Sequence, residues 1–254
     1  MFKRGTLKQK LREKSLTLGA WITLPNTSIA EIFANAGFDW VVIDLEHSTI
    51  TIDQTGELIR VIDLSGVSPL VRLTSNNSDL IKRVMDAGAH GIIVPNICSA
   101  EEARYAVSST RYFPKGSRGV GLARAQGYGN SFHDYIEWQS DGPVVIVQIE
   151  NASALDNLES IFSVEGVDAF MIGPYDLSCS MGYPGEFNHI EFVEAKNKIL
   201  KTAKKVGCIS GYHVVEPDIS ILNSVVEEGF LFIAYSLDSK ILDVGARKVF
   251  NYKK

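Results

Sequence analysis

Eight short apolar runs with helical patterns between them constrain the fold more than any other feature of this sequence. The runs occupy residues 18–24, 40–46, 69–74, 91–96, 144–150, 169–173, 208–214 and 231–236. Most of them carry β-branched and apolar residues at consecutive positions, as parallel strands do when both of their faces are buried. Strands and helices that alternate eight times predict an α/β fold of the (β/α)8 TIM-barrel type.

The segments between the runs carry helix signals. Helical patterns cover residues 28–37, 78–88, 99–109, 189–207 and 218–229. In the first of these, Ser28 followed by Glu31 predicts a capping box. No GxGxxG turn follows the first apolar run, which disfavours a doubly wound sheet. The N-terminal segment is basic and lacks the apolar core of a signal peptide, so we expect a short amphipathic helix that caps the domain.

Length and composition fit one large domain, and we expect residues 1–254 to form a single barrel. The chain is 45% hydrophobic and 22% charged, an ordinary globular composition. Its net charge of −5 gives no electrostatic reason for binding nucleic acid or an anionic membrane, and no apolar run is long enough to span a bilayer. We therefore expect neither partner. The three widely spaced cysteines form no zinc or disulfide pattern, which predicts a reducing, cytoplasmic location.

One connection is longer than a barrel requires. Residues 111–142 separate the helical pattern at 99–109 from the apolar run at 144–150, and they are rich in glycine. A connection of this length is usually functional or disordered. Its varied composition favours an ordered active-site or subunit-contact loop, and a mobile surface insertion is the alternative.

Two acidic residues are expected at neighbouring strand ends, where barrels of this type hold their catalytic groups. Glu150 ends the fifth apolar run, and Asp176 follows the sixth. Two carboxylates suit a hard divalent cation such as Mg²⁺ and leave coordination positions for a 2-oxo acid and water. Two structural carboxylates that bind the loop backbone are the alternative interpretation.

His47 is the best acid–base candidate because an imidazole titrates near neutrality. Asp44 lies three residues earlier and can orient the ring; a hydrogen-bonded structural histidine is the alternative. Arg72 at the mouth of a barrel needs an anionic partner, which is either a substrate or a salt bridge to Glu46 or Asp44. No predicted strand ends in lysine, which argues against a Schiff-base aldolase.

Several motifs, in order and over nearly the whole chain, resemble the HpcH/HpaI family of class II pyruvate aldolases. They are LGAWITLPNTSIAEIFANAGFDWVVIDLEHS, VRLTSNN, AGAHGIIVPNICSAEEA, RGVGLARAQGYG, VQIEN and IGPYDLSCSMGYPGE. That family includes 4-hydroxy-2-oxoheptanedioate, 2-keto-3-deoxy-L-rhamnonate and 5-keto-4-deoxy-glucarate aldolases. The resemblance implies a barrel of the phosphoenolpyruvate/pyruvate-domain type. It also implies a homo-oligomer, a hexamer arranged as a trimer of dimers, in which the C-terminal helix is exchanged between subunits.

The resemblance also implies roles for individual residues. Glu150 and Asp176 match the metal ligands, for Mg²⁺, Mn²⁺ or Co²⁺. His47 matches the catalytic base, Asp44 its orienting partner, and Arg72 the arginine that binds the keto oxygen. The substrate-binding residues implied in the same way are Arg72, Gln148, Gly173, Pro174, Tyr175 and Asp176.

The activity implied by the resemblance is a metal-dependent aldolase. It would cleave a 4-hydroxy-2-oxo acid, such as a 2-keto-3-deoxy sugar acid or a related diacid, into pyruvate and an aldehyde. Two residues depart from the family: Leu45 stands where Gly is frequent, and Tyr175 where Ala or Ser is common. We expect both to crowd the aldehyde side of the pocket. A 2-oxo acid decarboxylase or lyase on the same metal–enolate platform, and a non-catalytic barrel, remain as alternatives.

Overall fold

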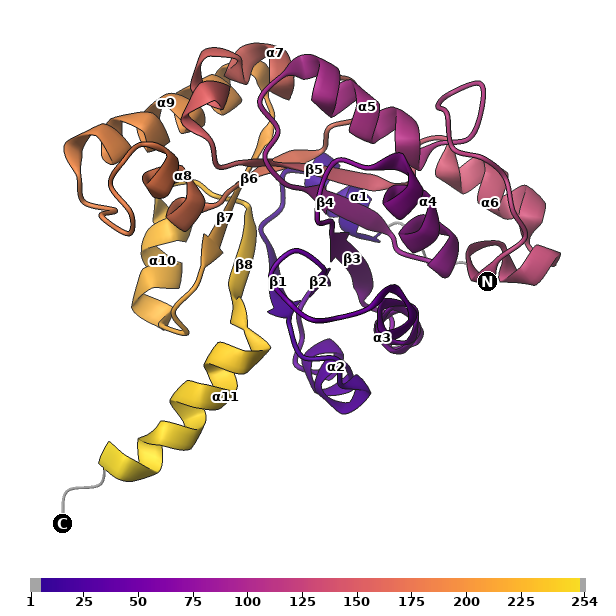
Figure 1. The fold of residues 1–254 in the computed structure, drawn as a ribbon, viewed down its shortest axis with the longest axis horizontal. Helices are drawn as coiled ribbons and strands as arrows, with labels where there is room; N and C mark the ends of the chain where they lie inside the picture. The colour runs from indigo at the N-terminus through magenta and orange to yellow at the C-terminus, as the bar shows by residue number, and fades with distance from the viewer. Residues whose placement is uncertain (1–5, 252–254) are drawn as a thin grey trace.

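The computed structural model describes residues 6–251 and contains a closed barrel of eight parallel strands (Figure 1). The strands are β1 (Thr17–Ile22), β2 (Trp40–Asp44), β3 (Ser68–Arg72), β4 (Gly91–Val94), β5 (Val144–Ile149), β6 (Ala169–Ile172), β7 (Ile209–Val214) and β8 (Phe232–Leu237). Each strand pairs with the next one in the sequence, and β8 closes the barrel against β1. Each of the eight predicted runs overlaps one strand, so the predicted (β/α)8 fold is confirmed.

Helices surround the barrel and connect its strands. They are α1 (Thr6–Arg12), α2 (Thr27–Asn35), α3 (Ile52–Leu64), α4 (Ser78–Ala87), α5 (Ala100–Thr110), α6 (Phe132–Gln139), α7 (Leu158–Phe162), α8 (Pro174–Ser180), α9 (Ile190–Val206), α10 (Ile219–Glu227) and α11 (Asp238–Arg247), with short 3-10 helices η1 (Arg124–Gly129), η2 (Ala152–Asp156) and η3 (Lys248–Asn251). None of the described helices is long and apolar enough to cross a membrane.

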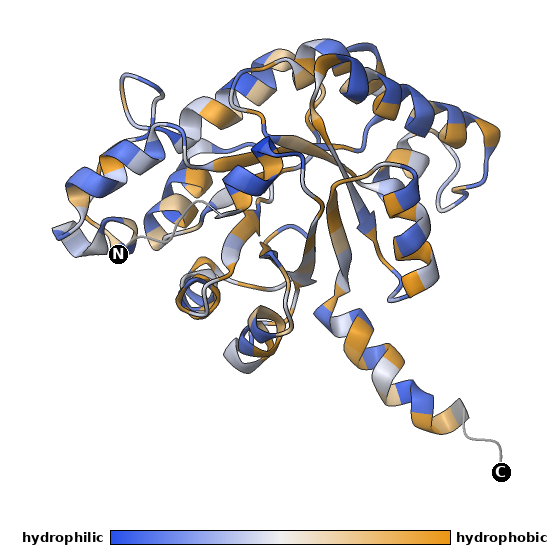
Figure 2. Ribbon diagram, turned by 180° about the vertical axis from the view of Figure 1, so that it is seen from behind, coloured by the Kyte–Doolittle hydropathy of each residue, from blue (hydrophilic) through white to orange (hydrophobic). Residues whose placement is uncertain are grey.

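Alternating side chains of the strands build two apolar layers. One set, including Trp40 and Phe232, fills the barrel interior, and their rings stack with centroids 4.1 Å apart. The other set packs outward against the helices. Figure 2 shows the corresponding distribution of hydropathy: orange, hydrophobic residues are frequent in the strands, and the helices carry both orange and blue residues. Burial of both strand faces explains the continuous apolar runs.

Helix α1 closes the amino end of the barrel. Leu7 and Leu11 are buried among the interior side chains, and Lys8 forms an ion pair of 2.6 Å with Asp168, immediately before β6. The predicted capping helix is confirmed over residues 6–12. The first five residues of the basic N-terminal segment lie outside the described part of the chain.

The predicted start of α2 is wrong by two residues. The side chain of Asn26 accepts hydrogen bonds from the backbone N–H groups of Ser28 and Ile29, so Asn26 is the N-cap, and Ser28 and Glu31 form no capping box. Asparagine, threonine and serine are all favoured N-cap residues. Because Asn26, Thr27 and Ser28 are consecutive, the sequence pattern did not identify which one caps the helix. The predicted helical patterns did not include α3, although Thr51 and Gln54 form a capping box at its start. They also did not include α6, α7, α8 and α11.

The long connection 111–142 folds into η1 and α6 at the amino end of the barrel. Arg124 forms an ion pair of 2.6 Å with Asp63 near the C-terminus of α3, and Arg12 of α1 pairs with Asp141. Helix ends and strand starts share this end of a barrel, so the segment lies opposite the catalytic mouth of its own chain. The prediction that residues 111–142 form an active-site loop is therefore wrong for the active site of the same chain. The prediction that they form a subunit contact stays a prediction.

Candidate active site

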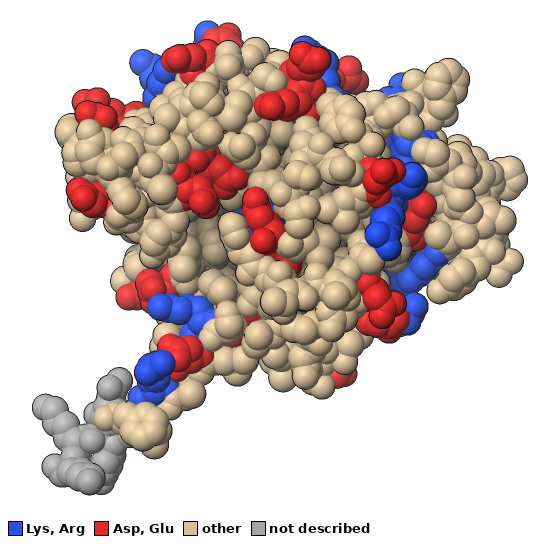
Figure 3. All heavy atoms as spheres, viewed as in Figure 1, with Lys and Arg blue, Asp and Glu red and all other residues tan. Residues whose placement is uncertain are grey.

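A cavity of about 280 Å³ opens at the carboxyl end of the barrel. Its walls are formed by Trp21, His47, Arg72, Gln148, Met171, Gly173, Pro174, Tyr175, Asp176, His213 and Val215. The remaining predicted residues, Asp44 and Glu150, do not line the cavity. They accept hydrogen bonds from two residues that do, Asp44 from Arg72 and Glu150 from Gln148. Figure 3 shows acidic side chains near the centre of this face. The structure therefore brings the residues predicted from scattered motifs to one place.

Arg72 is held in one orientation by three neighbours. The parallel register of β2 and β3 places it beside Asp44. Its Nε and Nη2 donate to the two oxygens of that carboxylate at 2.8 and 2.6 Å. Nη1 lies 3.3 Å from Glu46, and the guanidinium carbon lies 4.3 Å over the Trp21 ring. A bidentate pair with a stacked face fixes the planar fork in the cavity wall.

His47 has a different partner from the one predicted. The carboxylate of Asp44 accepts from the backbone N–H of His47 at 3.3 Å, while its two oxygens are engaged by Arg72. The ring Nε2 instead lies 3.9 Å from Glu46 Oε2, and the side chain is 60% exposed. Asp44 is buried under Arg72, and the chain turns outward before His47. The expected orientation of the ring by Asp44 is thus corrected, and Glu46 is its nearest acid.

The carboxylates at the mouth carry more negative charge than Arg72 neutralises. Burial raises the pKa of Glu150 to about 7; a hydrogen bond from the Asn96 N–H opposes the rise, and the charge of Glu46 adds to it. Burial likewise raises the pKa of Glu46 to about 7, against the opposing effect of Arg72. Asp176 contributes to both increases. Groups with such shifted pKa values are typical of functional sites.

The absence of a side chain at Gly173 allows the Glu150 carboxylate to lie close to the backbone. A Cβ atom at this position would lie 2.6 Å from Glu150 Oε2 and 2.9 Å from Gln148 Nε2, closer than real contacts allow. Gln148 donates to Glu150 through Nε2, while its Oε1 is buried without a partner among the described residues. Pro174 then starts α8 and places Asp176 in the first turn.

These donors fit a divalent cation. In the described part of the chain, no group of three or more His, Cys, Asp or Glu is placed to hold a metal ion. Two carboxylates, such as those of Glu150 and Asp176, would leave the other coordination positions to substrate and water, as hard cations such as Mg²⁺ accept. Bound positive charge would also offset the like charges that raise the pKa of Glu150.

The two residues expected to crowd the pocket have different positions. Tyr175 lines the cavity, is half exposed, and packs edge-to-face on Phe187 at 5.0 Å. Leu45 is 8% exposed and packs in the apolar layer outside the barrel. The expectation for Leu45 is wrong, because successive residues of a strand point to opposite faces and its neighbour Asp44 takes the inner one.

Trp21 and His213 belong to the cavity but received no role from the sequence. Both face inward from β1 and β7, and their ring centroids lie 5.2 Å apart. Glu46 was considered only as a partner of Arg72. Inward alternation along β1 is the signal that identifies Trp21, but its use requires the strand register.

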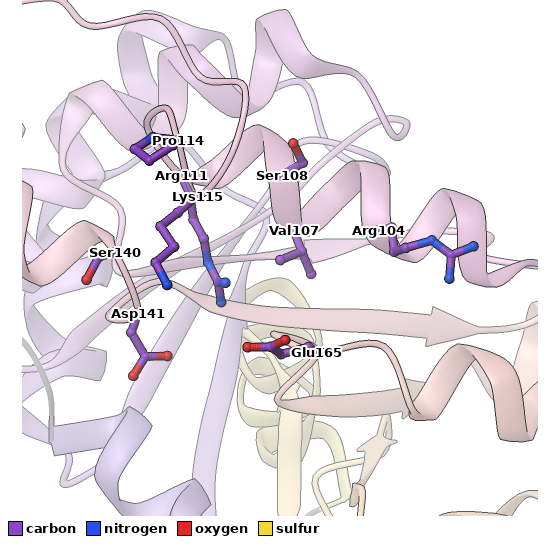
Figure 4. A pocket seen from close by; sticks show the side chains of 9 residues that line it. All are labelled: Arg104, Val107, Ser108, Arg111, Pro114, Lys115, Ser140, Asp141 and Glu165. Carbon is purple, nitrogen blue, oxygen red and sulfur yellow. The ribbon is translucent and has the colours of Figure 1, made fainter.

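A second hollow of about 400 Å³ lies at the amino end, beside the C-terminus of α5. Figure 4 shows Arg111 and Lys115 pointing toward the side where Asp141 and Glu165 lie. Acids and bases are mixed there, and the hollow is far from the strand ends that carry the predicted residues. The smaller cavity at the carboxyl end is therefore the candidate active site.

The comparison with protein families agrees with this geometry. The family model described as HpcH/HpaI aldolase/citrate lyase matches residues 17–243. The chain belongs to this family. The resemblance inferred from the motifs is thereby confirmed.

Individual relatives cover nearly the whole chain. It is 35% identical over 236 residues to the 2-keto-3-deoxy-L-rhamnonate aldolase of Escherichia coli (strain K12), covering 92% of this chain and 87% of the relative. A HpcH/HpaI aldolase/citrate lyase family protein from Burkholderia cenocepacia J2315 superimposes with a TM-score of 0.92 at 32% identity, covering 97% and 98% of the two chains. The citrate synthase SbnG superimposes with a TM-score of 0.84 at 26% identity, covering 96% of each chain.

Proposed function

We propose that this protein is a metal-dependent aldolase that reversibly cleaves a 4-hydroxy-2-oxo acid into pyruvate and an aldehyde. The observation that carries the proposal is a fixed Arg72 in the wall of a cavity that buried, mutually repelling carboxylates, including Glu150, surround. Membership of the HpcH/HpaI family and the similarity to a 2-keto-3-deoxy-L-rhamnonate aldolase support it. A 2-keto-3-deoxy sugar acid or a related diacid is the proposed substrate class.

Glu150 and Asp176 would hold the divalent ion, for which Mg²⁺, Mn²⁺ and Co²⁺ are the candidates. When bound, the ion supplies Lewis-acid stabilisation of negative charge on the substrate. Gln148 and the backbone from Gly173 to Asp176 would bind the 2-oxo acid beside it; these residues line the cavity.

Arg72 faces the oxygen on which charge develops. In the cleavage direction the C3–C4 bond breaks, and its electron pair moves toward C3 and the 2-oxo oxygen. The guanidinium is already held by Asp44 at 2.8 and 2.6 Å, so it needs no reorganisation to stabilise that charge. Asp44 acts here as the residue that positions Arg72.

His47 moves the proton. Its exposed ring at the mouth would accept the proton of the 4-hydroxyl as the C4 carbonyl of the aldehyde forms. Returning a proton to C3 gives the pyruvate methyl group. Glu46 lies 3.9 Å from the ring and stabilises the imidazolium form.

We also propose that residues 1–254 form one domain and that the protein is a cytoplasmic homo-oligomer, a hexamer with exchanged C-terminal helices. Helix α11 projects away from the barrel (Figure 1). Its exposed Leu242, together with Val249 and Phe250 of η3, forms an apolar end that a neighbouring subunit would cover. The described cysteines are all unpaired, which suits a reducing compartment.

Proton exchange at the pyruvate methyl group tests this function without knowledge of the aldehyde. The protein is incubated with pyruvate in D₂O and followed by NMR with Mn²⁺, with Mg²⁺ and with EDTA. We expect exchange with metal and none with EDTA. Folded protein that exchanges no proton with any metal would overturn the proposal, and oxaloacetate in parallel reports a decarboxylase instead.

A further inference from the structure

Two buried ring nitrogens on residues of the active-site cavity have no hydrogen-bond partner in the described part of the protein. They are the indole Nε1 of Trp21 and the imidazole Nε2 of His213. Their rings are neighbours, with centroids 5.2 Å apart, and both side chains line the cavity next to Arg72. A buried polar group without a partner destabilises the folded state, because it loses its hydrogen bonds to water. Two such nitrogens on neighbouring residues of one cavity are available to a bound molecule.

The imidazole of His213, a residue that lines the cavity, carries a buried and unpaired hydrogen-bond acceptor. A backbone hydrogen bond to Ser236 raises the pKa of the ring, as an accepting carbonyl does. Because Nε2 has no partner, this bond uses the Nδ1–H. Burial and the nearby charge of Arg72 outweigh it and lower the pKa of His213 to about 3, so the ring is neutral and Nε2 carries a lone pair.

The backbone around Ser236 keeps this arrangement in place. Ser236 has a φ of 57°, a left-handed conformation that costs a non-glycine residue energy. Its hydroxyl donates to the Val215 carbonyl at 2.8 Å, which ties β8 to the end of β7 beside His213. Conformations of this kind persist where the surrounding structure fixes them, often at ligand sites.

Chemistry then restricts what can bind here. A lone pair on Nε2 accepts only from an O–H or N–H group and repels a carboxylate or phosphate oxygen. The indole N–H of Trp21 donates only. One acceptor and one donor on neighbouring walls match a hydroxyl group, which both donates and accepts. Pyruvate has only acceptor oxygens and leaves Nε2 unpaired.

We propose that His213 Nε2 and the Trp21 Nε1–H bind a hydroxyl group of the substrate, so that the enzyme selects a hydroxylated substrate over its deoxy analogue. This inference rests on the proposed aldolase function. The hydroxyl is carried by the aldehyde or by C3 of the 2-oxo acid. His213 and Trp21 are thus specificity-determining residues.

Two matched substrate pairs test the inference. In the first, pyruvate is condensed with lactaldehyde or with propanal; in the second, propanal is condensed with hydroxypyruvate or with pyruvate, each with Mn²⁺. We expect the wild type to prefer the hydroxylated member of one pair, and that pair identifies the source of the hydroxyl. His213→Leu should reduce this kcat/KM ratio about three- to tenfold, the size expected for one neutral hydrogen bond.

Two further variants separate this role from a structural one. His213→Gln supplies an amide oxygen as acceptor and should recover part of the preference. Tyr212→Phe removes a hydroxyl from the adjacent residue, which packs against Phe230 in the outer layer, and should leave the ratio unchanged. Equal ratios in the wild type and His213→Leu, or no preference in either pair, would overturn the inference.

Proton exchange at the pyruvate methyl keeps the two proposals apart. If exchange depends on metal but the kcat/KM ratio is the same in the wild type and in His213→Leu, the aldolase function is supported and hydroxyl recognition by His213 is refuted. Absence of exchange in the folded wild type refutes the aldolase, and hydroxyl recognition with it.

Discussion

The two ends of the barrel both contain buried charge, but they balance it differently. At the amino end, Lys8 faces Asp168 at 2.6 Å and also donates to the Pro143 carbonyl at 3.0 Å, so the cation and the anion neutralise each other. At the carboxyl end, several acids gather around the single guanidinium of Arg72. They are Asp44, Glu46, Glu150 and Asp176.

The difference separates a structural charge from a functional one. The Lys8–Asp168 pair stabilises the fold as long as both charges are present. Because each charge neutralises the other, neither is available to bind a ligand. Burial is the main cause of the raised pKa values of Glu46 and Glu150, and neighbouring acids add to it, whereas no acid adds to the effect of burial on Asp168. A bound cation would offset the repulsion between the acids at the carboxyl end. Variants at the two ends should therefore change different quantities.

Removal of one carboxylate at the crowded end should have the largest effect. Glu150→Gln preserves shape but removes a proposed metal-binding oxygen, and we expect kcat to fall about 10³-fold, as loss of a strong electrostatic contact does. Steady-state cleavage across a Mn²⁺ titration measures it. Glu165→Gln in the amino-end hollow is the matched control and should retain activity. A Glu150→Gln enzyme with metal-stimulated turnover would place the metal elsewhere.

Breaking the closed pair should change stability instead. Lys8→Ala leaves Asp168 buried without its cation, and we expect the free energy of unfolding to fall by about 3 kcal/mol. Urea denaturation measures it. The comparison variant Lys10→Ala breaks a more exposed pair with Asp39 and should cost at most about 1 kcal/mol. Equal losses of unfolding free energy in the two variants would show that burial of the Lys8–Asp168 pair does not increase its contribution to stability.

His47 provides the next effect in size. Its ring is 60% exposed, so His47→Ala should fold normally but lower kcat about 10²-fold, the usual range for a positioned acid–base group. Cleavage rates over a pH series measure it. His133→Ala, at an exposed position of α6, is the control. Near-normal kcat for the His47 variant would assign the proton transfer to another group.

The smallest effect is the pH dependence of stability. Glu150 and Glu46 have pKa values raised from 4.5 to about 7. Between these values the unfolded chain is ionised while the folded carboxyls keep their protons. The contribution of these two carboxyls to the stability of the metal-free protein should therefore fall as pH rises through this window, on the order of 1–2 kcal/mol. The lowered pKa of His213 has the opposite effect below about pH 6.5.

Denaturation at pH 5 and pH 8 measures this loss, with EDTA and with Mn²⁺. Mn²⁺ should remove the loss, because the bound ion favours the ionised carboxylates. Glu150→Gln should reduce it in EDTA. His213 has the same effect in the wild type and in Glu150→Gln, so an equal pH dependence of stability in these two proteins would contradict the raised pKa of Glu150.

Several parts of the candidate site were predictable from the sequence because they depend on local order. Residues at the ends of parallel strands must meet at one end of a barrel, so His47, Arg72 and Asp176 could be grouped before their positions were known. Gly173 and Pro174 mark the turn into α8 in the same way. The closed pair at the other end has no such signal, because Lys8 and Asp168 are 160 residues apart.

By itself, the sequence determined the eight-stranded barrel, its capping helix and its family, because burial on both strand faces and motif order are written along the chain. Only the tertiary structure decided which partner each polar group has. It gave Asp44 to Arg72 rather than to the His47 ring, turned Leu45 away from the cavity, and placed Trp21 beside His213. Such choices depend on strand register and on distances across the barrel, which no local pattern records.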